Sequence, residues 1–374
     1  MNKALFIVVN VDWFFLSHRL PIALAAKEKG YRVTIVSKDT GKREEIEALG
    51  LRFINVEFER SGANPLHELR CIKILYKIYK LEKPDIIHHV TLKASLLGCL
   101  AAKLSGIKRV VNAISGFGYN FTDERTGIKQ RIIKTMMNMA FKSKKFHFIF
   151  QNPDDINQFM KFNFVSEDQI HLIKGSGVDL NRFTYEKPIA KEKVQVVLPA
   201  RMLYDKGIIE FIQAAKKIKD KVVDKAEFVL VGDCDTINLS GIKEEDIKRE
   251  IDVPFLNWIG FKKDIFSVIK KSDIVVLPSY REGLPKSLIE ACAVGRPIVT
   301  TNVEGCRECV IEGYNGYLVP AKNIDTLSEK MEDLINDSEK RTRMGINGRI
   351  LAEKNFSIDF VIREHLRIYK DLES

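Results

Sequence analysis

The chain has 374 residues, 45% of them hydrophobic, and a formal net charge of +10 at pH 7. This length suits two domains of roughly 150–190 residues, each able to bury a full core. Six scattered cysteines exclude a disulfide framework and indicate thiols in a reducing cytosol. No stretch of ~18 uncharged apolar residues is present to span a membrane.

The first half of the chain alternates strand-like and helix-like segments, which predicts a parallel sheet with helices on both faces. The apolar run at residues 4–11 fits a first strand better than a signal peptide, because Asn10 and Asp12 interrupt it and no small-residue cleavage site follows. Later strands are expected at RVTIVS, RFINVEF, DIIHHV, RVVNAI and FHFIF, with helices at 66–81 and ASLLGCLAAKLSG.

A linker around residues 185–192 leads into a second series of strands and helices. Its strands are expected at VQVVLPA, AEFVLVGD, FLNWIGF, DIVVLPS and RPIVTTN. Helices from 324 to 355 close this half, and one more helix is expected over FSIDFVIREHLRIYKDL. The sequence therefore predicts two α/β domains, without internal repeats or low-complexity tracts.

Charged side chains follow two strands of the second series at turns that lead into helices. Arg201 and Lys206 follow VQVVLPA, while Glu282 follows DIVVLPS and is separated by seven residues from Glu290. The helix that carries Glu290 is expected to begin near Pro285, which places the two carboxyl groups roughly 12 Å apart. This span suits one carboxylate for a sugar ring and one for a ribose, with a diphosphate over the helix N-terminus. The backbone groups expected to face that diphosphate belong to Gly283, Leu284 and Pro285.

At these residues the chain resembles the retaining family 4 glycosyltransferases, which use nucleotide-sugar donors. The resemblance implies that Arg201 and Lys206 hold the donor diphosphate, that Glu282 contacts the donor sugar, and that Glu290 binds the ribose hydroxyls. It extends over nearly the whole chain, since further matching segments occur in the family's order. These segments are VLVGD, NWIGF, RPIVTTNVEGCRECV and YNGYLVP.

The resemblance also implies the GT-B fold, in which two Rossmann-like domains face each other across a cleft. The expected N-terminal domain, on the acceptor and membrane side, covers residues 1–187. The expected nucleotide-sugar domain covers 188–355. The last helix, within 356–374, is expected to cross back onto the N-terminal domain.

The candidate catalytic residues are Arg201, Lys206 and Glu282. Cleavage of a sugar–phosphate bond leaves negative charge on the diphosphate, which preorganised cations stabilise most in the transition state. Glu282 has a rival role as a general acid or a nucleophile on the opposite face of the sugar. The resemblance favours a same-face substitution without a protein nucleophile. Taken singly, Arg201 or Lys206 is better explained as a solvated loop residue.

Neither a metal nor a cofactor is expected. Asp233 and Asp235 form the D-x-D pattern of a different glycosyltransferase fold, but their place after a strand is typical of a turn. Cys306 and Cys309 form one C-x2-C without a second pair at zinc spacing, and they are interpreted as packing residues.

Acceptor-side candidates lie in the first half of the chain. Ser17 and His18 are expected on the loop after the first strand, in the FFLSHR pattern of a bacterial surface-polysaccharide subgroup. Gly116, in ISGFGYNFT, would let the backbone approach an acceptor. His88 follows the strand PDII and is expected to face the cleft, although a structural histidine explains it equally well.

The positive charge is concentrated in the first half. Residues 1–187 carry 30 Lys and Arg against 19 Asp and Glu, whereas 188–374 carry 30 against 31. Residues 127–147 hold six cations and no acid on an amphipathic pattern. An anionic membrane surface is the favoured partner of this half, because no nucleic-acid motif accompanies the charge. A core-packed helix with a basic outer side is the alternative.

The sequence thus predicts a cytoplasmic enzyme, peripheral on the inner face of the cell membrane. It would move a hexose or N-acetylhexosamine from a nucleotide diphosphate sugar, probably UDP-linked, to a polyprenyl-diphosphate-linked saccharide. The setting would be bacterial polysaccharide or glycan assembly, as in capsule or O-antigen. The alternatives are a sugar-nucleotide epimerase of similar fold and a catalytically silent scaffold of a polysaccharide complex.

Overall fold

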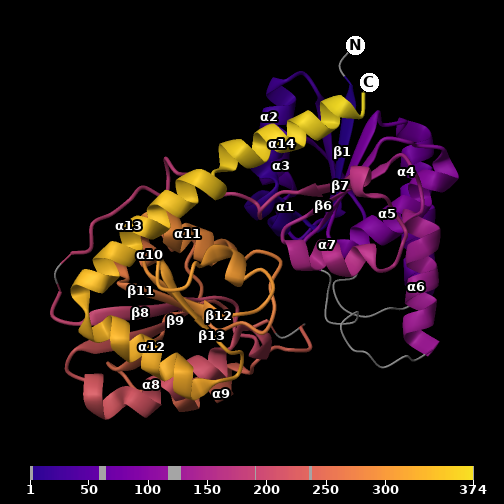
Figure 1. Ribbon diagram of the computed structural model, residues 1–374. Coiled ribbons are helices and arrows are strands. Elements are labelled where there is room, and N and C mark those ends of the chain that lie inside the picture. The colour runs from indigo at the N-terminus through magenta and orange to yellow at the C-terminus, as the bar shows by residue number, and fades with distance from the viewer. Residues whose placement is uncertain (1–2, 59–64, 117–127, 190, 236–237, 374) are drawn as a thin grey trace. The chain divides into compact units, whose positions relative to one another are not determined.

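The computed structural model describes residues 3–58, 65–116, 128–189, 191–235 and 238–373, with the backbone alone at 128–133. The chain forms two compact units, one made of residues 1–176 with 360–374 and the other of residues 177–359 (Figure 1). Each unit is built on a parallel sheet, which confirms the expected pair of Rossmann-like domains. Among the described helices, none has the length and apolar character needed to cross a bilayer.

The N-terminal unit contains a seven-stranded parallel sheet in the order β3-β2-β1-β4-β5-β6-β7. The strands alternate with helices as the sequence predicts, and the central strands are buried on both faces. The strands are β1 (Ala4–Val11), β2 (Arg32–Lys38), β3 (Arg52–Asn55), β4 (Ile86–Val90), β5 (Val110–Ile114), β6 (Phe146–Phe150) and β7 (Ile170–Leu172). The helices are α1 (Asp12–His18), α2 (Leu20–Glu28), α3 (Arg43–Ala48), α4 (Pro65–Glu82), α5 (Leu92–Ser105), α6 (Ile128–Phe141), α7 (Pro153–Met160) and α14 (Ile358–Asp371).

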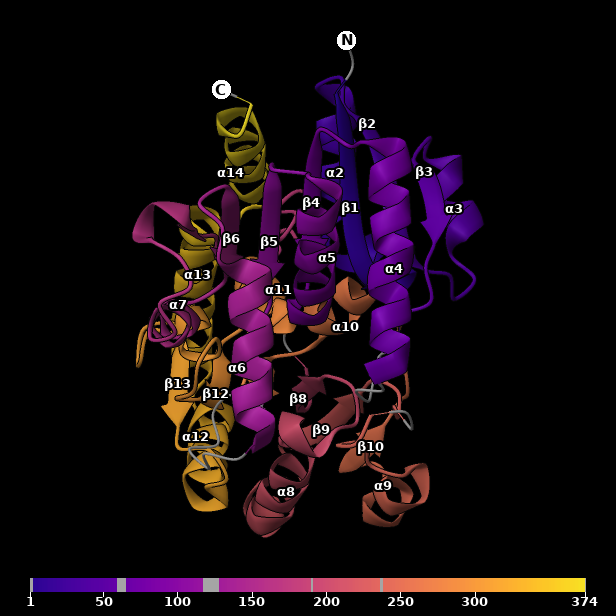
Figure 2. The same ribbon diagram turned by 90° about the vertical axis from the view of Figure 1, so that its right-hand side faces the viewer.

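Helices α4, α5 and α6 cover one face of this sheet (Figure 2). His89 points to that face, where its ring meets the Tyr79 hydroxyl of α4 at 3.0 Å. Its neighbour His88 must point to the other face, since side chains alternate along a strand. There the His88 Nδ1 lies 2.6 Å from the Tyr369 hydroxyl of α14. The last helix therefore covers the N-terminal sheet, as the predicted fold requires.

Further polar contacts fix the end of α14 to the N-terminal unit. The Tyr31 hydroxyl donates to the Glu373 carboxylate at 2.7 Å, and the Lys3 ammonium lies 2.7 Å from the same carboxylate. The Arg109 Nε donates to the Leu372 carbonyl at 2.8 Å. These contacts join residues from both ends of the sequence in one folded unit.

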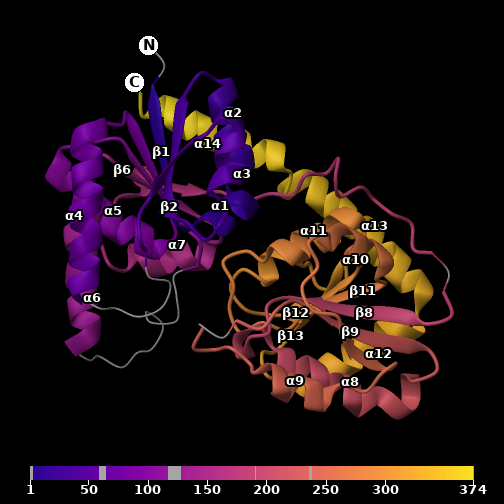
Figure 3. The same ribbon diagram turned by 180° about the vertical axis from the view of Figure 1, so that it is seen from behind.

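The C-terminal unit contains a six-stranded parallel sheet in the order β10-β9-β8-β11-β12-β13 (Figure 3). The strands are β8 (Val194–Pro199), β9 (Ala226–Val231), β10 (Leu256–Trp258), β11 (Ile274–Leu277), β12 (Ile298–Thr301) and β13 (Gly316–Val319). The helices are α8 (Ile208–Val222), α9 (Glu244–Glu250), α10 (Ile265–Lys271), α11 (Lys286–Val294), α12 (Ile324–Asn336) and α13 (Ser338–Asn355). The strand order reverses between β8 and β11, the place where open α/β sheets bind ligands.

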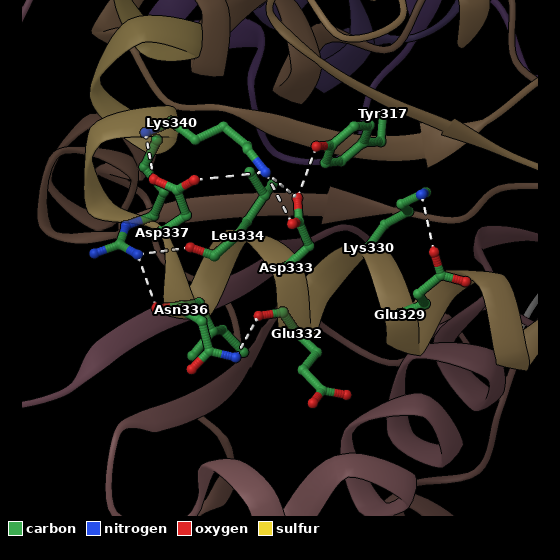
Figure 4. A network of polar contacts seen from close by, with 11 residues as sticks. Tyr317, Glu329, Lys330, Glu332, Asp333, Leu334, Asn336, Asp337 and Lys340 are labelled. Carbon is green, nitrogen blue, oxygen red and sulfur yellow. Dashed lines mark hydrogen bonds and ion pairs between the residues drawn. The ribbon is translucent and has the colours of Figure 1, made fainter.

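Polar contacts hold the turn between α12 and α13 (Figure 4). The Lys340 ammonium donates to both oxygens of the Asp333 carboxylate, at 2.8 and 2.9 Å, and the Tyr317 hydroxyl of β13 donates to it at 2.7 Å. The Arg341 Nη1 donates to the Leu334 carbonyl at 2.6 Å, which satisfies one of the last carbonyls of α12. The network thereby positions α13, which packs on α11.

The boundaries of the units differ from those expected. Residues 177–187 belong to the C-terminal unit, and the change back to the N-terminal unit falls at 359/360 rather than 355/356. The Val178 amide donates to the Phe356 carbonyl at 2.8 Å, and the Arg349 Nη1 donates to the Phe183 carbonyl at 2.7 Å. These contacts explain why the linker packs with the unit that follows it.

Candidate active site

Lys206 lies on the tight connection between β8 and α8. A short 3₁₀ turn, Tyr204–Lys206, precedes Gly207, whose φ of 71° is in the left-handed region. A Cβ atom at Gly207 would lie 2.2 Å from the Pro278 carbonyl oxygen, so only glycine fits there. The close approach brings the loop after β8 against the loop after β11. The sequence predicts both loops but not the contact that joins them.

Glu282 lies on the loop between β11 and α11, where its carboxylate forms an ion pair with the Lys206 ammonium. The Ser279 hydroxyl donates to the same carboxylate oxygen at 2.8 Å. Ser279 is fully buried, and its own carbonyl accepts the Thr301 hydroxyl of β12. Both members of the ion pair keep some exposure, 22% for Lys206 and 12% for Glu282. The ion pair is therefore fixed by the buried Ser279 and still partly accessible to solvent.

Three backbone contacts fix the Glu282 loop further. The Glu282 amide donates to the Glu304 carbonyl at 3.2 Å. Gly305, with a φ of 74°, comes so near that a Cβ atom would lie 2.5 Å from the Glu282 carbonyl oxygen. The Tyr280 amide donates to the Asp205 carbonyl at 2.9 Å, which ties this loop to the turn of Lys206. Side-chain positions in the site thus depend on a network of backbone contacts.

Arg201 follows β8 on the same side of the sheet and pairs with an acid that the sequence analysis did not assign to the site. Its Nη1 lies 2.5 Å from the Asp235 carboxylate, and its side chain is 45% exposed. The other acid of the D-x-D pattern, Asp233, accepts the Phe261 amide at 3.1 Å. Both acids therefore have structural partners. Within the described part of the chain, no three His, Cys, Asp or Glu side chains gather as metal ligands would.

Glu290 lies in the second turn of α11 and is 5% exposed. Burial raises the pKa of its carboxyl group to about 7, against the opposing effect of the positive charges of Lys286 and Arg182. The Lys286 ammonium lies 3.6 Å from the carboxylate, one turn earlier on the helix. A polar group buried at this cost, beside two cations, is typical of a functional site.

The turn before α11 has the expected order of residues. Pro285 occupies the N-cap position, and Gly283 and Leu284 precede it in the turn. The amide groups that follow a helix N-cap have no partner within the helix and favour an anion. The structure thus brings Glu282, Lys206 and this helix start into one region of the C-terminal unit. Ser279, Asp235, Lys286 and Arg182 join them. Lys286 and Ser279 lie close in the sequence to the glutamates they contact, Glu290 and Glu282, whereas Asp235 and Arg182 had no local signal.

Two of the four acceptor-side candidates are adjacent in the N-terminal unit. Ser17 and His18 lie at the end of helix α1, which begins directly after β1 and replaces the expected loop. The Ser17 Oγ lies 2.5 Å from the His18 Nδ1, and the His18 ring stacks on Phe14 with centroids 4.1 Å apart. Both side chains are at least partly accessible. Their role toward an acceptor stays a prediction.

His88 is buried within the unit, where burial holds its pKa well below the ordinary value and keeps the ring neutral. Its ring lies between β4 and α14, with His365 at 5.4 Å and Tyr369 at 5.8 Å between centroids. This placement gives His88 a structural contact. Gly116 follows β5 with a φ of 81°, and residues 117–122 of the same expected motif lie outside the described residues.

In the described part of the basic segment 127–147, residues 128–141 form α6, residues 142–145 form a connection, and residues 146–147 begin β6. In the part whose side chains are described, Met137, Ala140 and Phe141 are buried, whereas Met139 is 54% exposed. The sequence pattern puts Met136 and Met139 on one apolar face with Met137 and Ala140 beside it, and the structure turns the latter two to the core. The exposed side chains between residues 134 and 141 are Lys134, Thr135, Asn138 and Met139.

Comparisons with known proteins agree with this architecture. Residues 181–351 match the family described as "Glycosyl transferases group 1", and residues 4–152 match "Glycosyl transferase 4-like". A Campylobacter jejuni protein, N,N'-diacetylbacillosaminyl-diphospho-undecaprenol alpha-1,3-N-acetylgalactosaminyltransferase, is 32% identical over 95% of this chain and 97% of its own length. An Escherichia coli protein, UDP-Gal:alpha-D-GlcNAc-diphosphoundecaprenol alpha-1,3-galactosyltransferase, is 27% identical over 89% of this chain and 90% of its own.

Solved structures share the fold. A glycosyltransferase from Rickettsia africae has a TM-score of 0.77 at 20% identity, covering 100% of this chain and 99% of that one. Anabaena HepE, in complex with UDP and glucose, has a TM-score of 0.76 at 18% identity, covering 98% and 99%.

Proposed function

The chain belongs to the family 4 glycosyltransferases, and on that basis we propose that it transfers a hexose or N-acetylhexosamine from a UDP-sugar, with retention, to a polyprenyl-diphosphate-linked saccharide. The names of both relatives above specify a diphospho-undecaprenol acceptor, and one specifies a UDP-linked donor. The product would enter a bacterial surface polysaccharide or glycan. A Staphylococcus aureus capsular polysaccharide glycosyltransferase, 27% identical over 98% of this chain, supports that setting.

The observation that carries this proposal is the ion pair between Lys206 and Glu282, braced by Ser279 at the reversal of the strand order. A lysine ammonium has three donors, so Lys206 can contact both a carboxylate and a diphosphate oxygen. Arg201 adds a planar guanidinium group with several N–H donors at the same edge of the sheet. This set can hold a diphosphate and a sugar in contact with one another.

The proposed reaction breaks the bond between the anomeric carbon and the diphosphate oxygen, whose electron pair stays with the departing UDP. Lys206 and Arg201 stabilise the charge that grows on that oxygen. The acceptor hydroxyl attacks the same face of the anomeric carbon, and its proton passes to the departing phosphate oxygen. Because Lys206 and Ser279 already engage the Glu282 carboxylate, we assign Glu282 to positioning the donor sugar rather than to nucleophilic attack.

A lipid-linked acceptor requires the enzyme to work at a membrane surface. We therefore propose a cytoplasmic location, peripheral on the inner face of the cell membrane, with contact through the basic N-terminal unit. The excess of 30 Lys and Arg over 19 Asp and Glu in residues 1–187 supports this contact. No metal or cofactor is part of the proposed reaction.

The test is transfer from a panel of UDP-sugars to undecaprenyl-diphosphate-linked saccharides, with the anomeric configuration of the product read by NMR. We expect one UDP-sugar to give an α-linked product. Lys206→Ala should slow transfer by about 10²–10³, whereas Lys354→Ala, at an exposed lysine of α13, should not. A β-linked product would refute retention. Conversion of the UDP-sugar to an epimer without an acceptor would establish the epimerase instead. A chain that neither binds nor consumes any donor would be a scaffold.

A further inference from the structure

A basic pocket of about 630 Å³ lies at the end of the N-terminal sheet where the parallel strands begin. Its lining includes Asp85 before β4, Lys108 and Arg109 before β5, Lys144 and Lys145 before β6, and Asp371 at the end of α14. Figure 2 shows the end of α14 beside these strand starts. The predicted acceptor-side residues Ser17, His18 and Gly116 follow strand ends at the opposite edge of the sheet. The pocket is thus separate from the acceptor side.

The lining of this pocket is net positive, and two acids outside the lining, Asp168 and Glu373, interact electrostatically with Lys144 and Arg109. Four cations line the pocket, Lys108, Arg109, Lys144 and Lys145, against the two acids Asp85 and Asp371. In the part of the chain that the structure describes, no ion pair links any of the four cations to a carboxylate.

The two acids of the pocket have other partners. The Asp85 carboxylate accepts the Ala4 amide at 2.7 Å, and the Asp371 carboxylate accepts the Arg367 Nη1 at 3.2 Å. The Arg109 Nε donates to the Leu372 carbonyl at 2.8 Å, so one edge of its guanidinium group is fixed by backbone. A guanidinium group fixed by the backbone, together with three ammonium groups, is suited to an anion with several oxygens.

Like charges that converge in a concave site repel one another, and a bound anion removes that repulsion. We propose that this pocket binds a phosphoryl anion, either the headgroup phosphate of an anionic lipid or a soluble phosphate compound. In the first case the inference rests on the proposed function and adds an anionic-lipid contact to the N-terminal unit, at the edge of the sheet opposite the acceptor-side residues.

The test compares the parent protein with the triple variant Lys108→Gln/Lys144→Gln/Lys145→Gln. The matched control is Lys73→Gln/Lys77→Gln/Lys80→Gln, which removes the same charge from three exposed lysines of α4 in the same unit. Arg109 is kept, because its contact with Leu372 is structural. Two probes are used, inorganic pyrophosphate by calorimetry and phosphatidylglycerol vesicles by sedimentation.

We expect the pocket variant to bind phosphatidylglycerol vesicles about a hundredfold more weakly than the parent, from about fivefold per lysine at an anionic surface. The control variant should change by less than about fivefold, and raising the salt from 0.1 M to 1 M should weaken the parent similarly. Loss of vesicle binding alone identifies the lipid headgroup as the source. Loss of pyrophosphate binding as well identifies a site open to soluble phosphates.

Equal effects of the two triple variants, or no binding of either probe by the parent at low salt, would overturn the proposal. Transfer to a short water-soluble acceptor analogue is measured in parallel and should stay within about twofold of the parent in both variants. If the parent itself does not transfer sugar to this analogue, the result counts against the proposed function and not against the pocket. The two failures are therefore distinguishable.

Discussion

Replacing Glu290 by glutamine is expected to weaken UDP binding and to stabilise the protein at the same time. The Glu290 residue is 5% exposed, and burial raises the pKa of its carboxyl group to about 7 in the folded protein, above its ordinary value of 4.5. The nearby charges of Lys286 and Arg182 offset only part of this cost. The glutamine side chain has nearly the same shape as glutamate but no charge. The substitution therefore reports the effect of the charge on UDP binding and on stability without a change in packing.

The affinity effect follows from the hydrogen bonds that a carboxylate accepts from ribose hydroxyls. Bonds to a charged group contribute about 1.5–3 kcal/mol, so the dissociation constant for UDP should rise by about one to two orders of magnitude at pH 8. In the parent, the ionised fraction of a group with a pKa of about 7 falls about tenfold between pH 8 and pH 6. From pH 8 to pH 6, UDP binding by the parent should therefore weaken about tenfold more than UDP binding by the variant. The comparison with the variant also corrects for the titration of UDP itself.

The stability effect has the opposite sign. Between pH 4.5 and 7 the folded state binds more protons at this group than the unfolded state, so the free energy of unfolding falls as the pH rises through this window. Above pH 7 the full penalty applies, up to about 3 kcal/mol. Glutamine removes it, so the variant should be more stable than the parent by up to that amount at pH 8, and equal to it at pH 4.

The assay is urea unfolding of the C-terminal unit. The chain has two tryptophans, Trp13 and Trp258, and replacing Trp13 by phenylalanine leaves the one in β10 as reporter of this unit. UDP affinity is measured by calorimetry on the same proteins. A variant that is less stable than the parent at pH 8 would refute the reasoning, because Lys286 and Arg182 would then outweigh the cost of burial. Unchanged UDP affinity would remove Glu290 from the ribose site.

Three further predictions address the rest of the C-terminal unit. Lys206→Ala should lower kcat by about 10²–10³ through loss of one preorganised donor, with a melting temperature within about 4 °C of the parent; near-native turnover would exclude Lys206 from the chemistry. Gly207→Ala should lower the free energy of unfolding by about 1–3 kcal/mol or more. The added Cβ would lie 2.2 Å from the Pro278 carbonyl oxygen, and the residue would have to keep a left-handed conformation. An unchanged urea midpoint would contradict this contact. Lys340→Ala should lower the free energy of unfolding by about 0.5–1.5 kcal/mol, because its bonds to Asp333 are lost. The decrease should be smaller at 1 M salt. A decrease that does not depend on salt would indicate lost packing instead.

The fold could be predicted from the sequence because the buried strands are continuous apolar runs. IVVLP (274–278) and VVLP (196–199) are buried on both faces, and such runs, bounded by turn residues, identify parallel strands without knowledge of their neighbours. The order of the strands then follows from the family. The turn residues were informative for the same reason, since Gly207 and Pro285 act through local backbone conformation.

The contacts that join separate segments could not be predicted in this way. The bond from Ser279 to Glu282 is local, but the pairing of Asp235 with Arg201 spans 34 residues and depends on the placement of β9 beside β8. The boundary at 176 is set by packing of residues 177–187 on α13 and α11, which a composition shift does not reveal. For α6, the rotation about the helix axis depends on the core it meets, and the periodicity alone selected a face that includes the exposed Met139.

The return of α14 to the N-terminal unit makes that unit discontinuous in the sequence, and this has a consequence for synthesis on the ribosome. The C-terminal unit, 177–359, is fully translated before α14 exists, so it can fold first although it comes second. At about 5–20 residues per second, the N-terminal sheet waits roughly 10–40 s for its last helix. During that time the face of β4 that carries His88 lacks the cover of Tyr369 and His365. A nascent chain stalled before α14 should therefore be a preferred target of chaperones and proteases.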